Sequence, residues 1–353
     1  SLPGVGARLD GPTQKLYVTA ATASLLPAFL NTKADRYADV PFESGTGALV
    51  NYDLIDTAVE GQHSTAGLFD LRAFSPWGAV SSGLLARHDS AGRDALGGQP
   101  ATVRLDTSYV YSDPHSLRRY RLGDFISGGL GWTRPLRFGG ARISSDFSMR
   151  PDLVTSPQPG LSGSATVPST VDVLIDGQRV LSRQVSPGPF EVPQLPVVTG
   201  ANTITLIVTD ALGRQQVQTL PFYASSTLLA PGLQTFSVEA GALRRNWGRV
   251  SDDYGDAATS ASYRRGLSEH LTLEAHGEGA ADLFMGGGGL AARVGDLGVV
   301  NLAVAGSGGG DREGALVSLG AQHLNRRFSL AASATFADSG FSDLGVLDGT
   351  PVP

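Results

Sequence analysis

Thr170-Val-Asp-Val-Leu-Ile-Asp176 is the stretch of sequence that decides the fold of this chain, because it has the pattern of the first strand of a tight hairpin. Its β-branched residues favour a strand, and Gly177 supplies the positive φ that an Asp-Gly turn requires. The return strand begins at Gln178. Further along, Ser186-Pro-Gly-Pro-Phe190 predicts an extended corner, because Pro fixes its own φ and pushes the preceding residue out of the helical region.

A second hairpin follows, with Ile204, Leu206 and Val208 on one face and a turn from Asp210 to Gly213. Together these features predict five or six short strands between residues 161 and 223. A segment of about sixty residues is near the lower limit for an independent core. We therefore expect a small Ig-like β-sandwich in the middle of the chain.

The sequence on both sides of this segment has a different pattern, in which apolar and polar residues alternate with a period of two. Clear examples are residues 101–111, 271–278 and 328–336. In the first of these runs, Arg104 and Asp106 fall on the polar side with Ser108. About a dozen such segments occur, each near the ~9–11 residues of a tilted membrane strand. The small sandwich is therefore expected to interrupt a larger antiparallel sheet.

The composition restricts the class of protein. The chain has 353 residues, with 46 Gly and only 17% charged residues, which suits a strand-rich protein with many turns. It contains no apolar run of ~18 residues, so no transmembrane helix is predicted. The net charge of −6 gives no basic surface for nucleic acid, and the lack of Cys excludes disulfides and thiolate metal sites. Alternation alone fits a membrane barrel and a soluble sandwich equally.

Several motifs in this chain occur in the order typical of one protein family. They are Tyr120-Arg-Leu-Gly-Asp124, residues 136–146 with Met149 and Pro151-Asp152, Ser186-Pro-Gly-Pro-Phe190, Leu195-Pro196, residues 205–214, Pro221-Phe-Tyr223, residues 228–232 and residues 236–241. Across these ~120 residues the chain resembles the pilus (fimbrial) ushers of the chaperone–usher pathway. The start, from Leu2-Pro3-Gly4 to Leu25-Leu-Pro27, resembles the tail of the usher's periplasmic N-terminal domain.

The resemblance implies a bacterial outer-membrane β-barrel whose lumen is closed by the inserted sandwich, called the plug. It also implies that the partners are periplasmic chaperone–pilin subunit complexes and outer-membrane lipid, and that the protein assembles and secretes the pilus fibre without a cofactor. A family barrel has about two dozen strands, towards the top of the usual range. We therefore expect a partial antiparallel transmembrane barrel, because about half of those strands occur here.

The expected domains are 1–40, the tail of the N-terminal domain with a linker; 41–160, barrel strands; 161–223, the plug; and 224–353, further barrel strands. The plug motif comprises Ser186, Pro187, Gly188, Pro189, Phe190, Asp210 and Gly213. Hinges are expected at Gly160, Ser225 and Ser226, where Gly, Ser and Pro flank the plug. Arg179, Arg183 and Arg214 are candidate contacts between the plug and acidic side chains of the barrel wall.

The sequence motifs that would indicate an enzyme or a metal site are weaker than those of the usher family. Gly287-Gly-Gly-Leu-Ala-Ala292 fits a dinucleotide-binding pattern, but no helical periodicity follows it, so we expect a glycine-rich hairpin loop. The six histidines lack the spacing of a metal site, and Asp252, Asp253 and Asp256 lack that of a calcium loop. We therefore expect no enzyme and no bound metal. The alternatives are a soluble multi-domain β adhesin or binding module, and another outer-membrane β-barrel transporter.

Overall fold

The computed structural model describes residues 5–10, 12, 14–20, 26–30, 44–59, 62–89, 100–310, 312–347 and 349. Within these residues the regular structure is β-strand, apart from a 3-10 helix at Phe147–Met149 and the short helix α1 (Leu344–Leu347). No helix among them has the length and apolar character needed to cross a membrane. The prediction of an all-β chain is confirmed.

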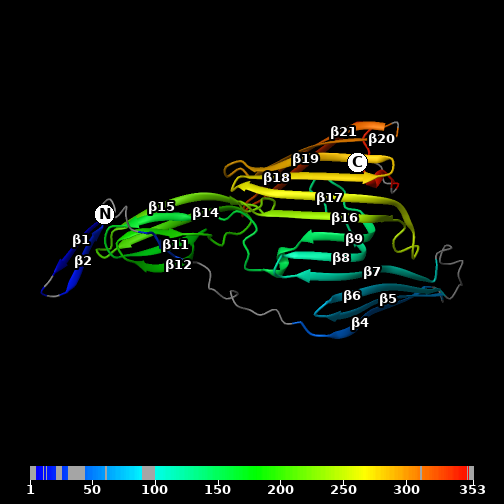
Figure 1. Cartoon of the computed structure of the whole chain (residues 1–353), viewed down its shortest axis with the longest axis horizontal. Coiled ribbons are helices and arrows are strands. Elements are labelled where there is room, and N and C mark those ends of the chain that lie inside the picture. Colours follow the sequence, from blue (N-terminus) through cyan, green and yellow to red (C-terminus); the bar gives the residue numbers. More distant parts are fainter. Residues whose placement is uncertain are drawn as a thin grey trace.

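A single antiparallel sheet of 13 strands forms the larger part of the molecule (Figure 1). In spatial order its strands are β4 (Gly47–Val59), β5 (Gln62–Ser75), β6 (Gly78–Asp89), β7 (Thr102–Asp113), β8 (Arg118–Ile126), β9 (Arg137–Ser145), β16 (Gln234–Arg244), β17 (Tyr254–Ser268), β18 (Leu271–Ala280), β19 (Leu283–Arg293), β20 (Val299–Gly309), β21 (Arg312–Leu324) and β22 (Ser329–Ala337).

The sheet is continuous across the point where the chain leaves it. β9 and β16 lie side by side, with Ser144 opposite Ser237, although the whole sandwich separates them in sequence. The two connections also meet, because the Ala230 N–H donates to the Thr155 carbonyl at 2.8 Å. The middle segment is therefore an insertion between two neighbouring strands, as predicted.

The insertion is a two-layer sandwich. Its strands are β10 (Leu161–Ala165), β11 (Ser169–Ile175), β12 (Gln178–Val185), β13 (Gly188–Val192), β14 (Gly200–Asp210) and β15 (Gln215–Ala224). One layer has the order β12-β11-β14-β15, and the other has the order β10-β13-β3, where β3 (Ala28–Phe29) comes from the start of the chain. Alternate residues point between the layers, and Val171, Val173, Phe190 and Ile204 form a buried core.

Both predicted hairpins are present in the sandwich. Asp176 and Gly177 link β11 to β12, and both have positive φ, at 52° and 83°, as a type I′ turn requires. In the second turn the Asp210 carboxylate accepts from the N–H groups of Leu212 and Arg214, at 2.8 and 2.9 Å. Ser186 and Pro187 lead into β13, and Gly188, Pro189 and Phe190 are its first residues.

A separate hairpin of β1 (Val5–Asp10) and β2 (Lys15–Ala20) precedes the sandwich and the large sheet. It falls within the segment expected to be the tail of an N-terminal domain. Residues 31–43, which complete that segment and begin the next, lie outside the described residues.

The glycine-rich run of the apparent dinucleotide pattern is not a hairpin loop, so that expectation is wrong. Gly287, Gly288 and Gly289 lie in the middle of β19 and pair with both neighbouring strands. A Cβ at Gly287 would approach the Ala305 Cβ to 2.6 Å, and one at Gly289 would approach the Trp132 Nε1 to 3.0 Å. The lack of a side chain leaves room for the neighbouring strand at Gly287 and for Trp132 at Gly289.

Candidate functional site

The large sheet has two chemically different faces. One face carries polar side chains in rows across neighbouring strands, such as Glu239 opposite Ser260 and Ser260 opposite Glu278. The other exposes large apolar side chains, with Phe284 and Phe336 at 66% and 64% exposure. Further members of this apolar face are Leu122, Val238, Tyr263, Leu273, Leu302, Val304, Leu319 and Leu330.

This distribution of side chains distinguishes a membrane barrel from a soluble sandwich, the two interpretations that alternation alone left open. A soluble antiparallel sheet buries its apolar face and exposes its polar face. Here the polar residues Glu239 and His276 are 1% and 6% exposed, whereas the apolar face is open. An extended exposed apolar face is typical of a surface that contacts lipid, and a polar interior is typical of a membrane barrel.

Two segments cover the polar face, and both are held by its acidic side chains. The first covering segment (Ser127–Leu136) lies between β8 and β9, and its Gly128 N–H donates to Glu239 Oε1 at 2.7 Å. Its Trp132 indole N–H donates to Glu274 Oε2 at 3.2 Å. The second covering segment (Asp338–Leu347) follows β22, and its Leu344 N–H donates to Glu278 Oε2 at 2.7 Å.

An ion pair joins the two covering segments to each other. Arg134 Nε in the first segment lies 2.7 Å from Asp343 Oδ2 in the second. The two residues are 209 positions apart in sequence, and both side chains are largely buried. The polar face therefore bears one connected layer of chain, which narrows the space beside the sheet.

Ser262, His276 and Glu278 form a chain of hydrogen bonds on the polar face. The Ser262 hydroxyl lies 2.8 Å from His276 Nδ1, and His276 Nε2 lies 3.0 Å from Glu278 Oε1. The order of groups resembles a nucleophile, base and acid. However, all three residues are less than a tenth exposed, and Glu278 is also bound by the second covering segment. We interpret the cluster as support for that segment.

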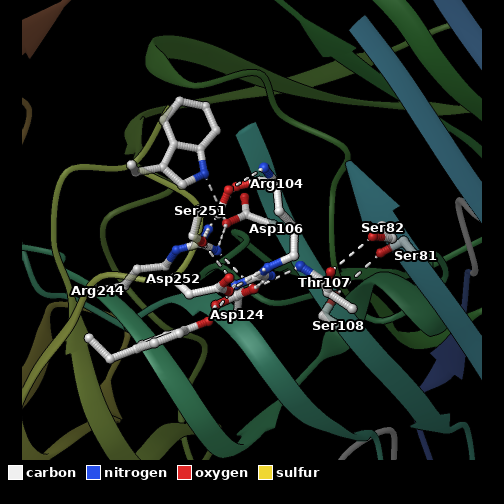
Figure 2. A network of polar contacts seen from close by, with 12 residues as sticks. Ser81, Ser82, Arg104, Asp106, Thr107, Ser108, Asp124, Arg244, Ser251 and Asp252 are labelled. Carbon is white, nitrogen blue, oxygen red and sulfur yellow. Dashed lines mark hydrogen bonds and ion pairs between the residues drawn. The ribbon is translucent and has the colours of Figure 1, made fainter. Parts of the chain in front are cut away.

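A partly buried network of charges (Figure 2) lies where β16 ends, at the end of the strands that is remote from the sandwich in Figure 1. Arg244 has a fully buried side chain and contacts Asp124 at 2.8 Å and Asp106 at 3.2 Å. Arg104 reaches the same Asp124 and also Asp252. Three carboxylates and two guanidinium groups thereby neutralise one another, with Asp124 and Arg244 buried and Asp106 and Asp252 partly exposed.

The network lies on the apolar side of the sheet, which corrects one expectation. The register between β6 and β7 shifts between Ser82 and Leu84, so two residues of β7, Leu105 and Asp106, oppose one residue of β6. This bulge reverses the alternation of β7 and places Arg104 on the side of Asp124, not on the side of Ser108. The loop after β16 covers the charges, with Ser251 and Trp247 both hydrogen-bonded to the network.

Arg244, Asp124 and Glu239 were not among the site residues predicted from the sequence, although Asp124 and Glu239 lie within the family motifs. Alternation assigns Glu239 to the polar face, and that pattern could have identified it. Alternation also places Asp124 on the same side as Leu122, where a charge is unexpected. The contacts with Arg104 on the adjacent strand β7 and with Arg244 on β16 explain why that carboxylate is tolerated.

The sandwich contacts the large sheet at the turn between β21 and β22 and at the end of β19. Arg326, between β21 and β22, pairs with Asp176 of the sandwich at 3.1 Å. The Leu324 N–H donates to the Tyr223 hydroxyl at 3.0 Å, and Arg293 lies 4.2 Å from the centre of the Phe222 ring. The sandwich therefore lies beyond one end of the strands (Figure 1), and not against the polar face, where a plug that closes the lumen is expected.

The predicted site residues are distributed over the sandwich and its attachments. Phe190 is buried in the core, and Gly188 begins β13 with a φ of 141°. Pro189 is half-buried in that strand, whereas Ser186 and Pro187 are exposed just before it. Gly213 has a φ of 80° in the second turn.

Asp210 organises that turn in its ionised form. Burial would raise the pKa of Asp210, but hydrogen bonds from the backbone and side chain of Arg214 and from the Leu212 N–H outweigh it. The pKa is therefore held below the ordinary value of 3.8.

The expected hinge residues lie where the sandwich meets its connections. Gly160 is exposed immediately before β10. Ser225 is buried and shares a 2.7 Å hydrogen bond with the Thr227 hydroxyl, whereas Ser226 is exposed. The structure thus brings the two connections together, although only Gly160 and Ser226 are open to solvent.

The three arginines expected to contact the barrel wall are exposed on the sandwich. Arg179 lies 3.7 Å from Asp172, and Arg214 lies 2.7 Å from Asp210, so both face carboxylates of the sandwich itself. Arg183 is exposed on β12. The ion pair between the sandwich and the large sheet has the opposite polarity, with the arginine, Arg326, on the sheet.

Metal ligation has no support from the described ranges, in which no group of three or more His, Asp or Glu side chains is arranged to hold an ion. Asp252, Asp253 and Asp256 each contact a different group, namely Arg104, Asn246 and Arg245. These aspartates therefore stabilise the loop between β16 and β17 through separate contacts.

Comparison with known proteins shows the family. The model of the family described as outer membrane usher protein matches residues 128–316, more than half of the chain. The outer membrane usher protein FaeD of Escherichia coli is 29% identical over 308 residues, which cover 85% of this chain and 34% of FaeD. The F1 capsule-anchoring protein of Yersinia pestis is 30% identical over 162 residues, 46% of this chain and 19% of that protein.

A solved structure has the same fold. It is the Escherichia coli P pilus tip assembly intermediate PapC-PapD-PapK-PapG, matched with a TM-score of 0.62 and 19% identity over 98% of this chain and 44% of that one. The chain spans about a third or less of the length of the curated relatives named above. Because this family model matches more than half of its residues, including the whole sandwich, the chain belongs to the outer membrane usher protein family.

Proposed function

We propose that this chain is the gated part of an outer-membrane pore that passes a growing pilus fibre. The observation that carries the proposal is the two-faced sheet with a sandwich inserted between adjacent strands. The apolar face suits lipid and the polar face suits a water-filled lumen. The inserted sandwich is a body of its own that two neighbouring connections attach to the wall.

We assign one role to each of the four segments expected from the sequence. Residues 1–40 link to a periplasmic domain, 41–160 and 224–353 supply wall strands, and 161–223 is the gate. The strand bounds support this division, because β9 and β16 belong to the wall and β10 to β15 belong to the sandwich.

Gating consists of movement of the sandwich between two positions. In the structure the sandwich lies beyond the strand ends, so only the two covering segments lie on the polar face among the described residues. In the closed position it fills the lumen. Gly160, Ser225 and Ser226 act as the hinges, and the exposed Arg179, Arg183 and Arg214 contact acidic groups of the wall. Each solvated ion pair contributes about 0–1 kcal/mol, so the closed position remains reversible.

The proposed partners are complexes of a periplasmic chaperone with a pilus subunit. The support comes from relatives, because the PapC usher has been solved together with PapD, PapK and PapG in an assembly intermediate. The proposed role is to receive such complexes, join the subunits in order and release the fibre through the bacterial outer membrane.

The test is to replace residues 161–223 by a short flexible linker in the full-length protein and to measure conductance in planar bilayers. The linker can be short because the two connections are hydrogen-bonded to each other. We expect a higher passive conductance than in the unaltered protein at the same reconstituted density. Equal conductance of the two proteins would refute the gate.

A further inference from the structure

A strand from the start of the chain completes the three-stranded layer of the sandwich. β3 pairs in parallel with β13, with Ala28 opposite Phe190 and Phe29 opposite Glu191. The Leu30 N–H then donates to the Glu191 carbonyl at 2.8 Å. Without β3, strand β13 would be an unprotected edge, which is a ready acceptor for another strand.

The Ser186–Phe190 motif limits how far this pairing can extend. Backbone groups of a strand point alternately to its two neighbours. The Glu191 carbonyl points to β3, so the backbone of Pro189, two residues earlier, points the same way. Proline has no N–H to donate. The β13 edge can therefore hold only a short added strand, which matches the two residues of β3.

One apolar side chain anchors the strand to the sandwich. Leu30 is half-buried and packs against the sandwich core, whereas Phe29 is 69% exposed and Leu26 is 93% exposed. The segment is held on β13 by two paired residues, one further backbone hydrogen bond and the packing of Leu30. Such a short attachment can form and release without unfolding the sandwich.

We propose that residues 28–30 are a detachable strap, which docks on the β13 edge while the sandwich lies outside the pore and so holds the gate open. The inference rests on the proposed gating function. The hairpin of β1 and β2 lies just before the strap. A sandwich that entered the lumen with the strap bound would pull this hairpin in with it. Strap binding therefore selects the outer position and shifts the population towards the open pore.

A disulfide between the two strands tests the proposal in the full-length protein. This chain contains no Cys, so Phe29→Cys with Glu191→Cys introduces a defined pair at directly opposed positions. The control pair is Phe29→Cys with Ser162→Cys, because Ser162 lies opposite Glu191 on the far side of β13. Two strand spacings of about 4.8 Å separate the control pair, beyond the reach of a disulfide.

We expect the first pair, but not the control pair, to form a disulfide on mild oxidation. The oxidised protein should conduct at least several-fold more than the same protein after reduction. Absence of the disulfide would overturn the strap, and so would a disulfide that forms without changing the conductance.

Two matched substitutions test the anchor without a cross-link. Leu30→Asp places a charge against the sandwich core and should lower the passive conductance several-fold, because fewer pores are held open. Leu26→Asp places the same charge on an exposed position just before the strap and should leave the conductance unchanged. Equal conductance of the two variants would contradict the anchor role of Leu30.

The sandwich deletion separates failure of the strap from failure of the gate. If deletion raises conductance but the disulfide has no effect, the gate stands and the strap is wrong. If deletion itself has no effect, both proposals are wrong.

Discussion

Replacing Arg244 by Met should release the loop between β16 and β17 from the end of the large sheet. The Arg244 guanidinium is fully buried and contacts Asp124 and Asp106. It also donates to the Ser251 carbonyl at 2.9 Å and to the Arg104 carbonyl at 3.1 Å. Met has a similar length but no charge and no donor, so both carboxylates and both carbonyls lose a partner.

The expected magnitude follows from burial. Breaking a buried ion pair by removing one partner costs about 3–5 kcal/mol. Arg137→Met is the matched control, because Arg137 also pairs with Asp106, at 2.9 Å, but is partly exposed. Its loss removes a half-exposed pair and the stacking on Trp247, which together amount to about 1–2 kcal/mol.

Hydrogen exchange in the full-length protein measures the difference locally. A destabilisation of 1.36 kcal/mol corresponds to a factor of ten, so Arg244→Met should speed exchange of residues 245–253 by roughly 100-fold to several thousand-fold. Arg137→Met should speed it by about 5–30-fold. If Arg137→Met has the larger effect, burial does not control this network and the reasoning fails.

Three further predictions concern the wall and the sandwich. Leu302→Arg places a charge on the apolar face and should destabilise the membrane-inserted state by about 2–4 kcal/mol in a urea titration, whereas Ser318→Arg on the polar face should not. Glu239→Ala removes the acceptor that holds the first covering segment, so that segment should become accessible to protease; unchanged cleavage would contradict the contact. Asp210→Asn should lower the melting temperature of the sandwich at neutral pH. The pKa of Asp210 is depressed, so its contribution is present above pH ~4 and is lost as the pH falls through the folded-state value. A difference that persists in strong acid would argue against an ionic role.

Local rules were sufficient for much of the architecture. The Asp176-Gly177 turn and the alternation on both sides of the insertion depend on neighbouring residues only, and both are present in the structure. The rows of Thr272, Glu274 and His276 on the polar face likewise follow from a period of two. The glycines at 287–289 were misassigned, because glycine is common both in turns and where the chain packs closely on a strand.

The sequence by itself determined a β-sandwich inserted between alternating strands, because turn chemistry and side-chain periodicity act over a few residues. It could not determine which face meets lipid, because alternation is the same in a soluble sheet. Only the tertiary structure decided that Arg104 joins Asp124 and Arg244 on the apolar side, since a bulge between β6 and β7 reverses the pattern. It also decided the position of the sandwich and the strap on β13. The contacts of Arg244, the position of the sandwich and the strap depend on pairs of residues more than a hundred positions apart, and such pairs leave no local periodicity to read.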